Sequence, residues 1–134
     1  MTSSSPDHTP DDIQLPQGLL NTLVAGDLLD AVYLYGSRAK GLARDDSDWD
    51  LAVLFNSYEA DVLERAIRPQ NLEAELERQF PDLDLSVVDL REVPVPLQWN
   101  IIQGIRLFDR GVPAVRRLEH AIISAWEKDY ERYC

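Results

Sequence analysis

The sequence predicts an α+β domain, a small mixed β-sheet of about four strands with helices packed mainly on one face. Short apolar runs rich in β-branched and aromatic residues predict strands at 31–35, 51–55, 83–90 and 105–108. The segments between and after them carry apolar residues at helical spacing. A chain of 134 residues has the length of one domain with a single core.

Apolar stripes, prolines and glycines set the expected helix limits. Residues 17–29 predict a helix with the apolar face Leu19, Leu20, Leu23 and Val24. A helix after Ser57 is expected to break at Pro69, and a second helix to run from Asn71 to Pro81. Residues 97–103 predict a short helix stopped by Gly104, and 112–133 predict a closing helix.

The ends of the chain predict one domain with a tail. Residues 1–16 are rich in Ser, Pro and acids and are expected to be a disordered tail, which leaves 17–134 as the single domain. No apolar run is long enough to span a membrane, and the N-terminus lacks a signal-peptide pattern, so a cytoplasmic location is expected. The one cysteine, Cys134, excludes an internal disulfide and a cysteine-based metal cluster.

The formal net charge of −11 limits the possible partners. Nucleic acids are bound through clustered Lys and Arg, and the sequence has no dense basic run, so direct nucleic-acid binding is not expected. An acidic chain suits a cation-dependent site or a basic protein partner.

Two aspartates open the second predicted strand. Asp48 and Asp50 are two residues apart, so both point to one face of the sheet, roughly 7 Å apart. Like charges held this close repel each other unless a cation lies between them, and carboxylate oxygens suit magnesium. The alternative is structural: one aspartate caps the loop and the other pairs with Arg44 or Lys40.

A third carboxylate, Asp84, favours the metal site. It falls in the apolar run at 83–90, and pairing of this strand beside the second one would bring it within about 5 Å of Asp48 and Asp50. Three such carboxylates are typical of a site for two magnesium ions that performs phosphoryl transfer. Asp89 lies on the opposite face of the strand and is expected at the surface.

The turn after the first predicted strand is a candidate phosphate site. Gly36 lets a ligand approach the backbone closely, and the Ser37 hydroxyl and the following N–H groups can bind phosphate oxygens. Arg38 and Lys40 add positive charge for a polyphosphate. A Gly-Ser pair after a strand is also consistent with an ordinary turn.

Gly36-Ser37, ten further residues and then Asp48-Trp49-Asp50 resemble the signature of the polymerase-beta-type nucleotidyltransferases. The Gly-Ser-Arg-Ala-Lys-Gly wording at 36–41 is similar to that of the minimal nucleotidyltransferases, the MNT group. The resemblance extends through Asp84 to the helix, glycine and short strand at 98–108. Lys40 departs from the usual arginine, and Trp49 from the usual small aliphatic residue.

The resemblance implies a nucleotidyltransferase fold and Mg²⁺-dependent transfer from ATP. Gly36 and Ser37 would hold the triphosphate, and Asp48 and Asp50 would bind the metals. Asp84 would be a further metal ligand and the general base. An attacking oxygen would displace pyrophosphate from the α-phosphorus and receive the nucleoside monophosphate.

The resemblance also implies a partner, because small MNT proteins are frequently antitoxins of HEPN toxins, which are RNases. The implied function is transfer of AMP to a tyrosine of a cognate HEPN toxin within a heteromeric complex, which silences the toxin. The short chain, with only a terminal helix after 108, favours an acceptor supplied by a partner. The alternatives are a small-molecule nucleotidyltransferase of the aminoglycoside-modifying kind, or a binding-only antitoxin with a vestigial site.

Overall fold

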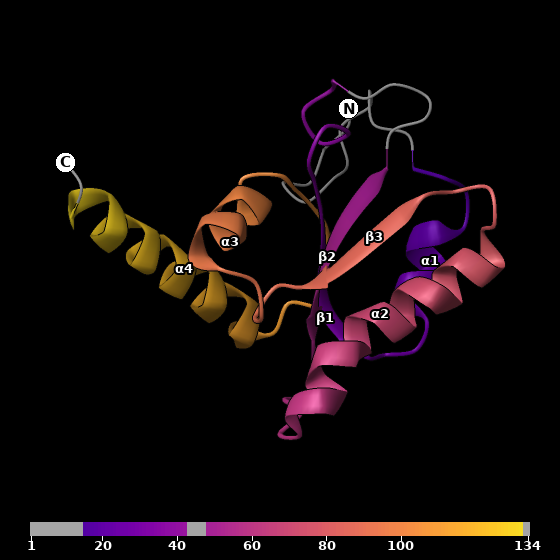
Figure 1. Cartoon of the computed structure of the whole chain (residues 1–134), viewed down its shortest axis with the longest axis horizontal. Helices are drawn as coiled ribbons and strands as arrows, with labels where there is room; N and C mark the ends of the chain where they lie inside the picture. Colours follow the sequence, from indigo (N-terminus) through magenta and orange to yellow (C-terminus); the bar gives the residue numbers. More distant parts are fainter. Residues whose placement is uncertain (1–14, 43–47, 133–134) are drawn as a thin grey trace.

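Four strands form one mixed sheet in the computed structural model, which describes residues 15–42 and 48–132 (Figure 1). The strands are β1 (Leu29–Tyr35), β2 (Trp49–Phe55), β3 (Leu85–Asp89) and β4 (Ile105–Asp109), in the order β3-β2-β1-β4. β1 pairs antiparallel with β2 and β4, whereas β3 pairs parallel with β2. The predicted class, a small mixed sheet of four strands with packed helices, is confirmed.

The helices cover both faces of this sheet. They are α1 (Leu19–Val24), α2 (Val62–Gln79), α3 (Val95–Ile102) and α4 (Pro113–Arg132). α1 and α2 lie against one face and α3 and α4 against the other, whereas the sequence analysis placed the helices mainly on one face (Figure 1). The reason is that all seven residues of β1 are buried, with Val32 facing α1 and α2, and Tyr33 facing α3 and α4.

Pro69 does not interrupt its helix. The sequence predicted a break at this residue, but α2 runs continuously from Val62 to Gln79 and buries Pro69. A proline inside a helix removes one backbone hydrogen bond, and here the packing of a long helix on the sheet outweighs that local cost. Asp61 caps α2 by accepting the N–H of Glu64 at 3.0 Å.

Most other elements begin or end within a few residues of the expected limits, and two differences affect the site. α1 ends at Val24 instead of Leu29, because the chain turns through Asp27, which has a φ of 57°, and β1 then begins at Leu29. β3 begins at Leu85, so Asp84 lies immediately before the strand.

Residues 1–14 of the predicted tail lie outside the described residues, whereas Leu15 packs against the core. In the part of the chain that the structure describes, no helix combines the length and the apolar character needed to cross a membrane.

The face under α3 and α4 is held by a partly buried charge network. Glu119 of α4 accepts a hydrogen bond from the Tyr33 hydroxyl at 2.6 Å and lies 3.0 Å from the Arg106 guanidinium of β4. Burial and the neighbouring Glu119 raise the pKa of Tyr33, so this phenol keeps its proton and remains a donor. The rings of Trp99 and Trp126 stack 5.3 Å apart and join α3 to α4.

We expect Glu119→Ala to lower the free energy of unfolding by about 3 kcal/mol, because Tyr33 and Arg106 lose a shared partner in a partly buried site. Urea unfolding measures the change. Glu119→Gln keeps an acceptor and should lose less, and Glu127→Ala, at an exposed position of α4, should stay within about 0.5 kcal/mol of the wild type. Equal losses at positions 119 and 127 would contradict a role of the network in holding α4.

Candidate active site

The antiparallel register of β1 and β2 brings the Gly-Ser turn against the aspartate pair. Tyr35, the last residue of β1, pairs with Asp50, so the turn that follows β1 begins beside Asp50. Gly36 has a φ of 76°, and a Cβ atom added there would lie 2.2 Å from Oδ2 of Asp50. Only glycine therefore fits without displacing the carboxylate.

Backbone hydrogen bonds close the turn after β1, and the predicted phosphate-binding residues in it differ in exposure. The backbone N–H groups of Ala39 and Lys40 donate to the Gly36 carbonyl at 3.1 and 3.2 Å, so these two donors are occupied within the turn. Ser37 is half-buried and Lys40 is exposed. The guanidinium of Arg38 lies 4.0 Å from the centre of the Trp49 ring.

The predicted aspartates occupy the same end of the sheet. Trp49 is buried among the core residues on the α1–α2 face, so Asp50, the next residue of β2, points to the other face. Asp48 immediately precedes the strand, and its charge acts on Asp50. The Trp49 N–H donates to the Asp84 carbonyl at 2.8 Å, and Trp49 pairs with Leu85. The parallel register therefore sets Asp84 beside the start of β2.

The three carboxylates are not drawn together around a common centre. Within 15–42 and 48–132, no three His, Cys, Asp or Glu side chains form a group that could hold a metal ion. Asp48 and Asp84 are exposed and Asp50 is half-buried. The backbone thus brings the aspartates to one edge, while their assignment as metal ligands and catalytic groups stays a prediction.

Electrostatics at this edge favour a cation. Burial, and then the charge of Asp48, raise the pKa of Asp50 above its ordinary value. Burial together with the charge of Asp50 raises the pKa of Tyr35 to about 12. Burial is the larger cause of both shifts, and the neighbouring carboxylate charge is the smaller one, which a divalent cation with oxygen ligands would offset.

A cavity of about 100 Å³ opens beside the Gly36 turn. Its lining includes Tyr35, Gly36, Lys40, Asn100, Gln103 and Ile105. The sequence analysis assigned no role to Asn100 or Gln103. The signal that could have indicated them is Gly104: a Cβ there would lie 2.3 Å from the Leu34 carbonyl, so this glycine lets the end of α3 pack directly on β1.

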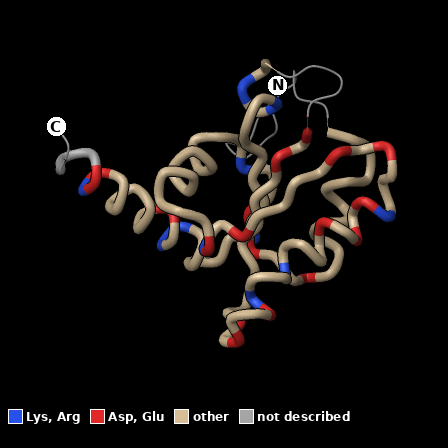
Figure 2. The backbone as a smooth tube through the Cα atoms, viewed as in Figure 1, with Lys and Arg blue, Asp and Glu red and all other residues tan. Residues whose placement is uncertain are grey.

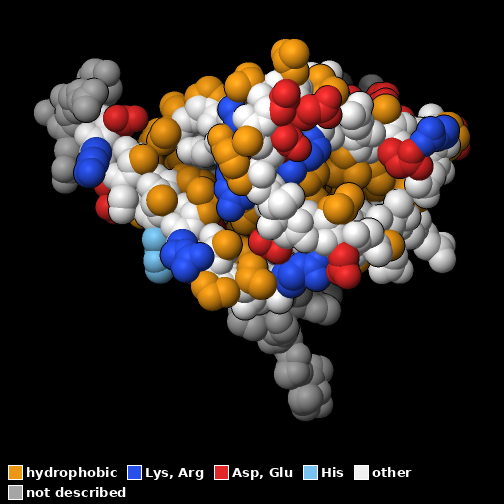
Figure 3. Space-filling view, turned by 90° about the horizontal axis from the view of Figure 1, so that it is seen from below, with side chains coloured by type: hydrophobic (Ala, Val, Ile, Leu, Met, Phe, Trp, Pro, Cys, Tyr) orange, Lys and Arg blue, Asp and Glu red, His pale blue; other side chains and the backbone are white. Residues whose placement is uncertain are grey.

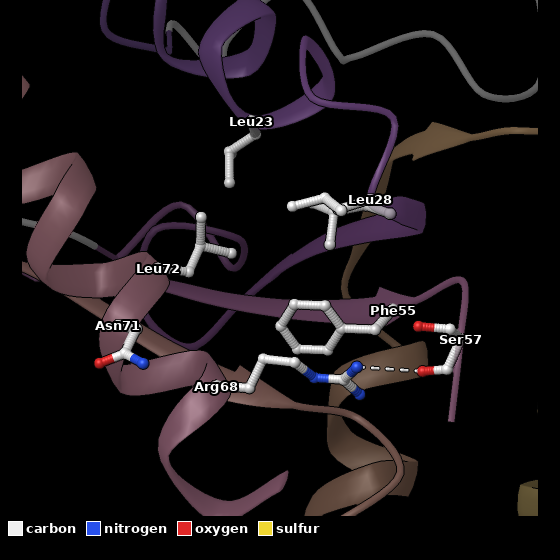
Figure 4. A pocket seen from close by; sticks show the side chains of 8 residues that line it. Leu23, Leu28, Phe55, Ser57, Arg68, Asn71 and Leu72 are labelled. Carbon is white, nitrogen blue, oxygen red and sulfur yellow. Dashed lines mark hydrogen bonds between the residues drawn. The ribbon is translucent and has the colours of Figure 1, made fainter. Parts of the chain in front are cut away.

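A larger cavity of about 270 Å³ lies between α1 and α2, at the other end of the sheet (Figure 4). Its walls are mostly apolar, and Leu28, one of its lining residues, is exposed. Hydrophobic side chains also appear on the surface of the face that Figure 3 shows. Arg68 is occupied structurally, since it donates to the Ser57 carbonyl at 3.1 Å and lies over the Phe55 ring. This cavity contains none of the predicted site residues.

Asp89 is the site-related prediction that the structure contradicts. It is 3% exposed rather than at the surface, and Arg68 approaches it from α2 at 3.9 Å. The backbone N–H of Arg91 also donates to it at 3.0 Å. Burial is the main reason that its pKa is raised, so Asp89 is a buried structural acid on the face opposite the candidate site.

Alanine at Gly36 tests the close contact with Asp50. Gly36→Ala and Gly41→Ala should both strain a backbone of positive φ by about 1 kcal/mol, but only the first meets a neighbouring atom. We expect crystal structures to show a rotated Asp50 side chain in Gly36→Ala alone, and urea unfolding to show the larger loss there. An unmoved Asp50 in that variant would contradict the contact.

Comparison with known proteins agrees with this geometry. The family model described as polymerase beta, nucleotidyltransferase matches residues 18–111. No curated protein matches the sequence.

Several solved structures share the fold. A chain of a structure described as a toxin–antitoxin with AMP-PNP is similar at a TM-score of 0.64 and 24% identity, covering 88% of this chain and 92% of that one. A mutant of the toxin–antitoxin MntA-HpeT gives 0.62 and 27%, covering 89% and 92%. A tri-AMPylated HEPN toxin in complex with its MNT antitoxin, from Shewanella oneidensis, gives 0.59 and 22%, covering 84% and 85%.

The family match covers more than half of the chain, and it includes the Gly36 turn and all three candidate aspartates. The chain therefore belongs to the polymerase beta nucleotidyltransferase family.

Proposed function

We propose that this nucleotidyltransferase is an antitoxin that acts in the cytoplasm and transfers AMP from ATP to a tyrosine of a cognate HEPN toxin. The observation that carries the proposal is the close approach of Gly36 to Asp50, because it sets the candidate phosphate-binding turn beside a candidate metal ligand. The similar solved structures support the choice of partner, since they are toxin–antitoxin complexes, one of them with an AMPylated HEPN toxin.

The site would hold the nucleotide through the turn and magnesium through the carboxylates. Ser37 and the backbone at Gly36 would hold the triphosphate, with Lys40 exposed in the same turn. Asp48, Asp50 and Asp84 offer the hard oxygen donors that Mg²⁺ prefers. Magnesium would supply electrostatic stabilisation of the phosphates.

In the proposed reaction, the tyrosine oxygen attacks the α-phosphorus of ATP and pyrophosphate leaves. The new bond joins the tyrosine oxygen to the α-phosphorus, and the bond that breaks joins the α-phosphorus to the bridging oxygen. Asp84 is exposed at the start of β3 and can accept the proton of the incoming hydroxyl. The acceptor would come from a partner protein, and the similar toxin–antitoxin structures, one with an AMPylated HEPN toxin, support this choice.

Substituting an aspartate of β2 should abolish transfer. We expect Asp50→Asn to remove AMP addition to the cognate toxin and to abolish neutralisation, because the site loses a charged ligand while its shape is kept. Intact mass of the toxin after incubation with magnesium and ATP measures the addition. Asp82→Asn, an exposed acid in the turn before β3, is the matched control and should retain activity.

The same assay separates the alternatives. Neutralisation that survives in Asp50→Asn would indicate a binding-only antitoxin with a vestigial site. Pyrophosphate release with a small molecule and no mass gain on the toxin would indicate a small-molecule nucleotidyltransferase.

Asp84 should act mainly in the chemical step. We expect Asp84→Asn to slow transfer by about 10²-fold or more while changing ATP binding less, since a general base contributes to the transition state. Single-turnover rates with the toxin, together with calorimetric ATP binding, make the comparison. An unchanged single-turnover rate would remove Asp84 from the mechanism.

A further inference from the structure

The cavity beside the Gly36 turn has one polar wall formed by α3. Asn100 is half-buried in the last turn of this helix, and Gln103 follows it as the C-cap residue. Both line the cavity opposite Gly36 and Lys40. Their position depends on Gly104, because any side chain there would meet the Leu34 carbonyl and push the end of α3 away from β1.

The amides of Asn100 and Gln103 are available to a ligand. Among the residues that the structure describes, neither side chain has a hydrogen-bond partner, whereas Gln98 on the same helix donates to the Leu90 carbonyl at 2.8 Å. Gln98 is therefore used for structure. The two amides at the end of α3 instead border an open space.

The chemistry of this wall selects a neutral hydroxyl-bearing group. The C-terminal end of a helix carries partial negative charge, which disfavours a phosphate at Asn100 and Gln103. An amide both donates and accepts hydrogen bonds, as a sugar hydroxyl does. Tyr35 and Ile105 supply apolar contact for the rest of a small ring.

Size and position narrow the choice further. A cavity of about 100 Å³ is well below the ~300 Å³ of a site for a whole drug-sized ligand, so it accepts one part of a nucleotide. It adjoins Gly36, where the phosphates are proposed to bind, and the ribose is the next group along the nucleotide.

We propose that this cavity holds the ribose of the bound nucleotide, with Asn100 and Gln103 hydrogen-bonding its 2′- and 3′-hydroxyls. The chain then selects ribonucleotides over deoxyribonucleotides by residues of α3 rather than of the signature turn. This inference rests on the proposed function, because it takes ATP as the ligand.

Calorimetric titration of the full chain with the magnesium complexes of ATP, 2′-deoxy-ATP and 3′-deoxy-ATP tests the inference without the toxin. We expect the wild type to bind ATP about three- to tenfold more tightly than the weaker of the two deoxy analogues, the effect of one lost hydrogen bond. The double variant Asn100→Ala/Gln103→Ala should bind ATP more weakly by a similar or larger factor, and should bind all three nucleotides alike. Gln70→Ala, an exposed amide on α2, is the control and should keep the wild-type preference.

These outcomes distinguish the ribose assignment from the proposed function on which it rests. Equal wild-type affinities for the three nucleotides overturn the ribose assignment and leave the proposed function intact. A double variant that keeps the wild-type nucleotide preference also overturns the ribose assignment. So does a double variant that keeps ATP affinity but loses AMP transfer to the toxin, because that result would place the acceptor side chain in the cavity. A wild-type chain that binds no nucleotide overturns the proposed function as well. If the double variant does not fold, the three wild-type affinities decide.

Discussion

The site depends on the close approach of the backbone at Gly36 to the carboxylate of Asp50. That approach requires a residue without a side chain at positive φ, and it requires the register in which Tyr35 pairs with Asp50. A shift of that register by one residue would turn Asp50 to the opposite face of the sheet and move it away from the turn. This close contact therefore fixes the positions of the Gly36 turn, the β1–β2 pair and the Asp50 carboxylate relative to one another.

Helices on the second face of the sheet complete the site. α3 reaches the end of β1 because Gly104 packs against Leu34, and the stacked rings of Trp99 and Trp126 join it to α4. α4 is in turn attached to β1 and β4 through Glu119. Packing remote from the turn thus decides where the side-chain amides of Asn100 and Gln103 lie relative to the Gly36 turn.

Charged residues determine the chemistry at the edge of the sheet where β2 and β3 begin. Acidic residues gather near the start of β2 and the start of β3, close to the basic segment after β1 (Figure 2). Burial and the neighbouring Asp48 disfavour the ionised form of Asp50, and a divalent cation bound there would stabilise that ionised form.

Local sequence patterns were sufficient for the approximate positions of the strands and for the turn at Gly36, because side chains alternate along a strand and a glycine of positive φ suits a turn. They were insufficient wherever packing between distant segments outweighs local preference. Pro69 stays inside a continuous helix, Asp89 is buried against Arg68, and the helices divide between both faces of the sheet. Each of these features depends on which elements pack together, and the spacing of residues along the chain does not contain that information. The cavity that adds Asn100 and Gln103 has the same origin, since it forms between segments more than sixty residues apart in the sequence.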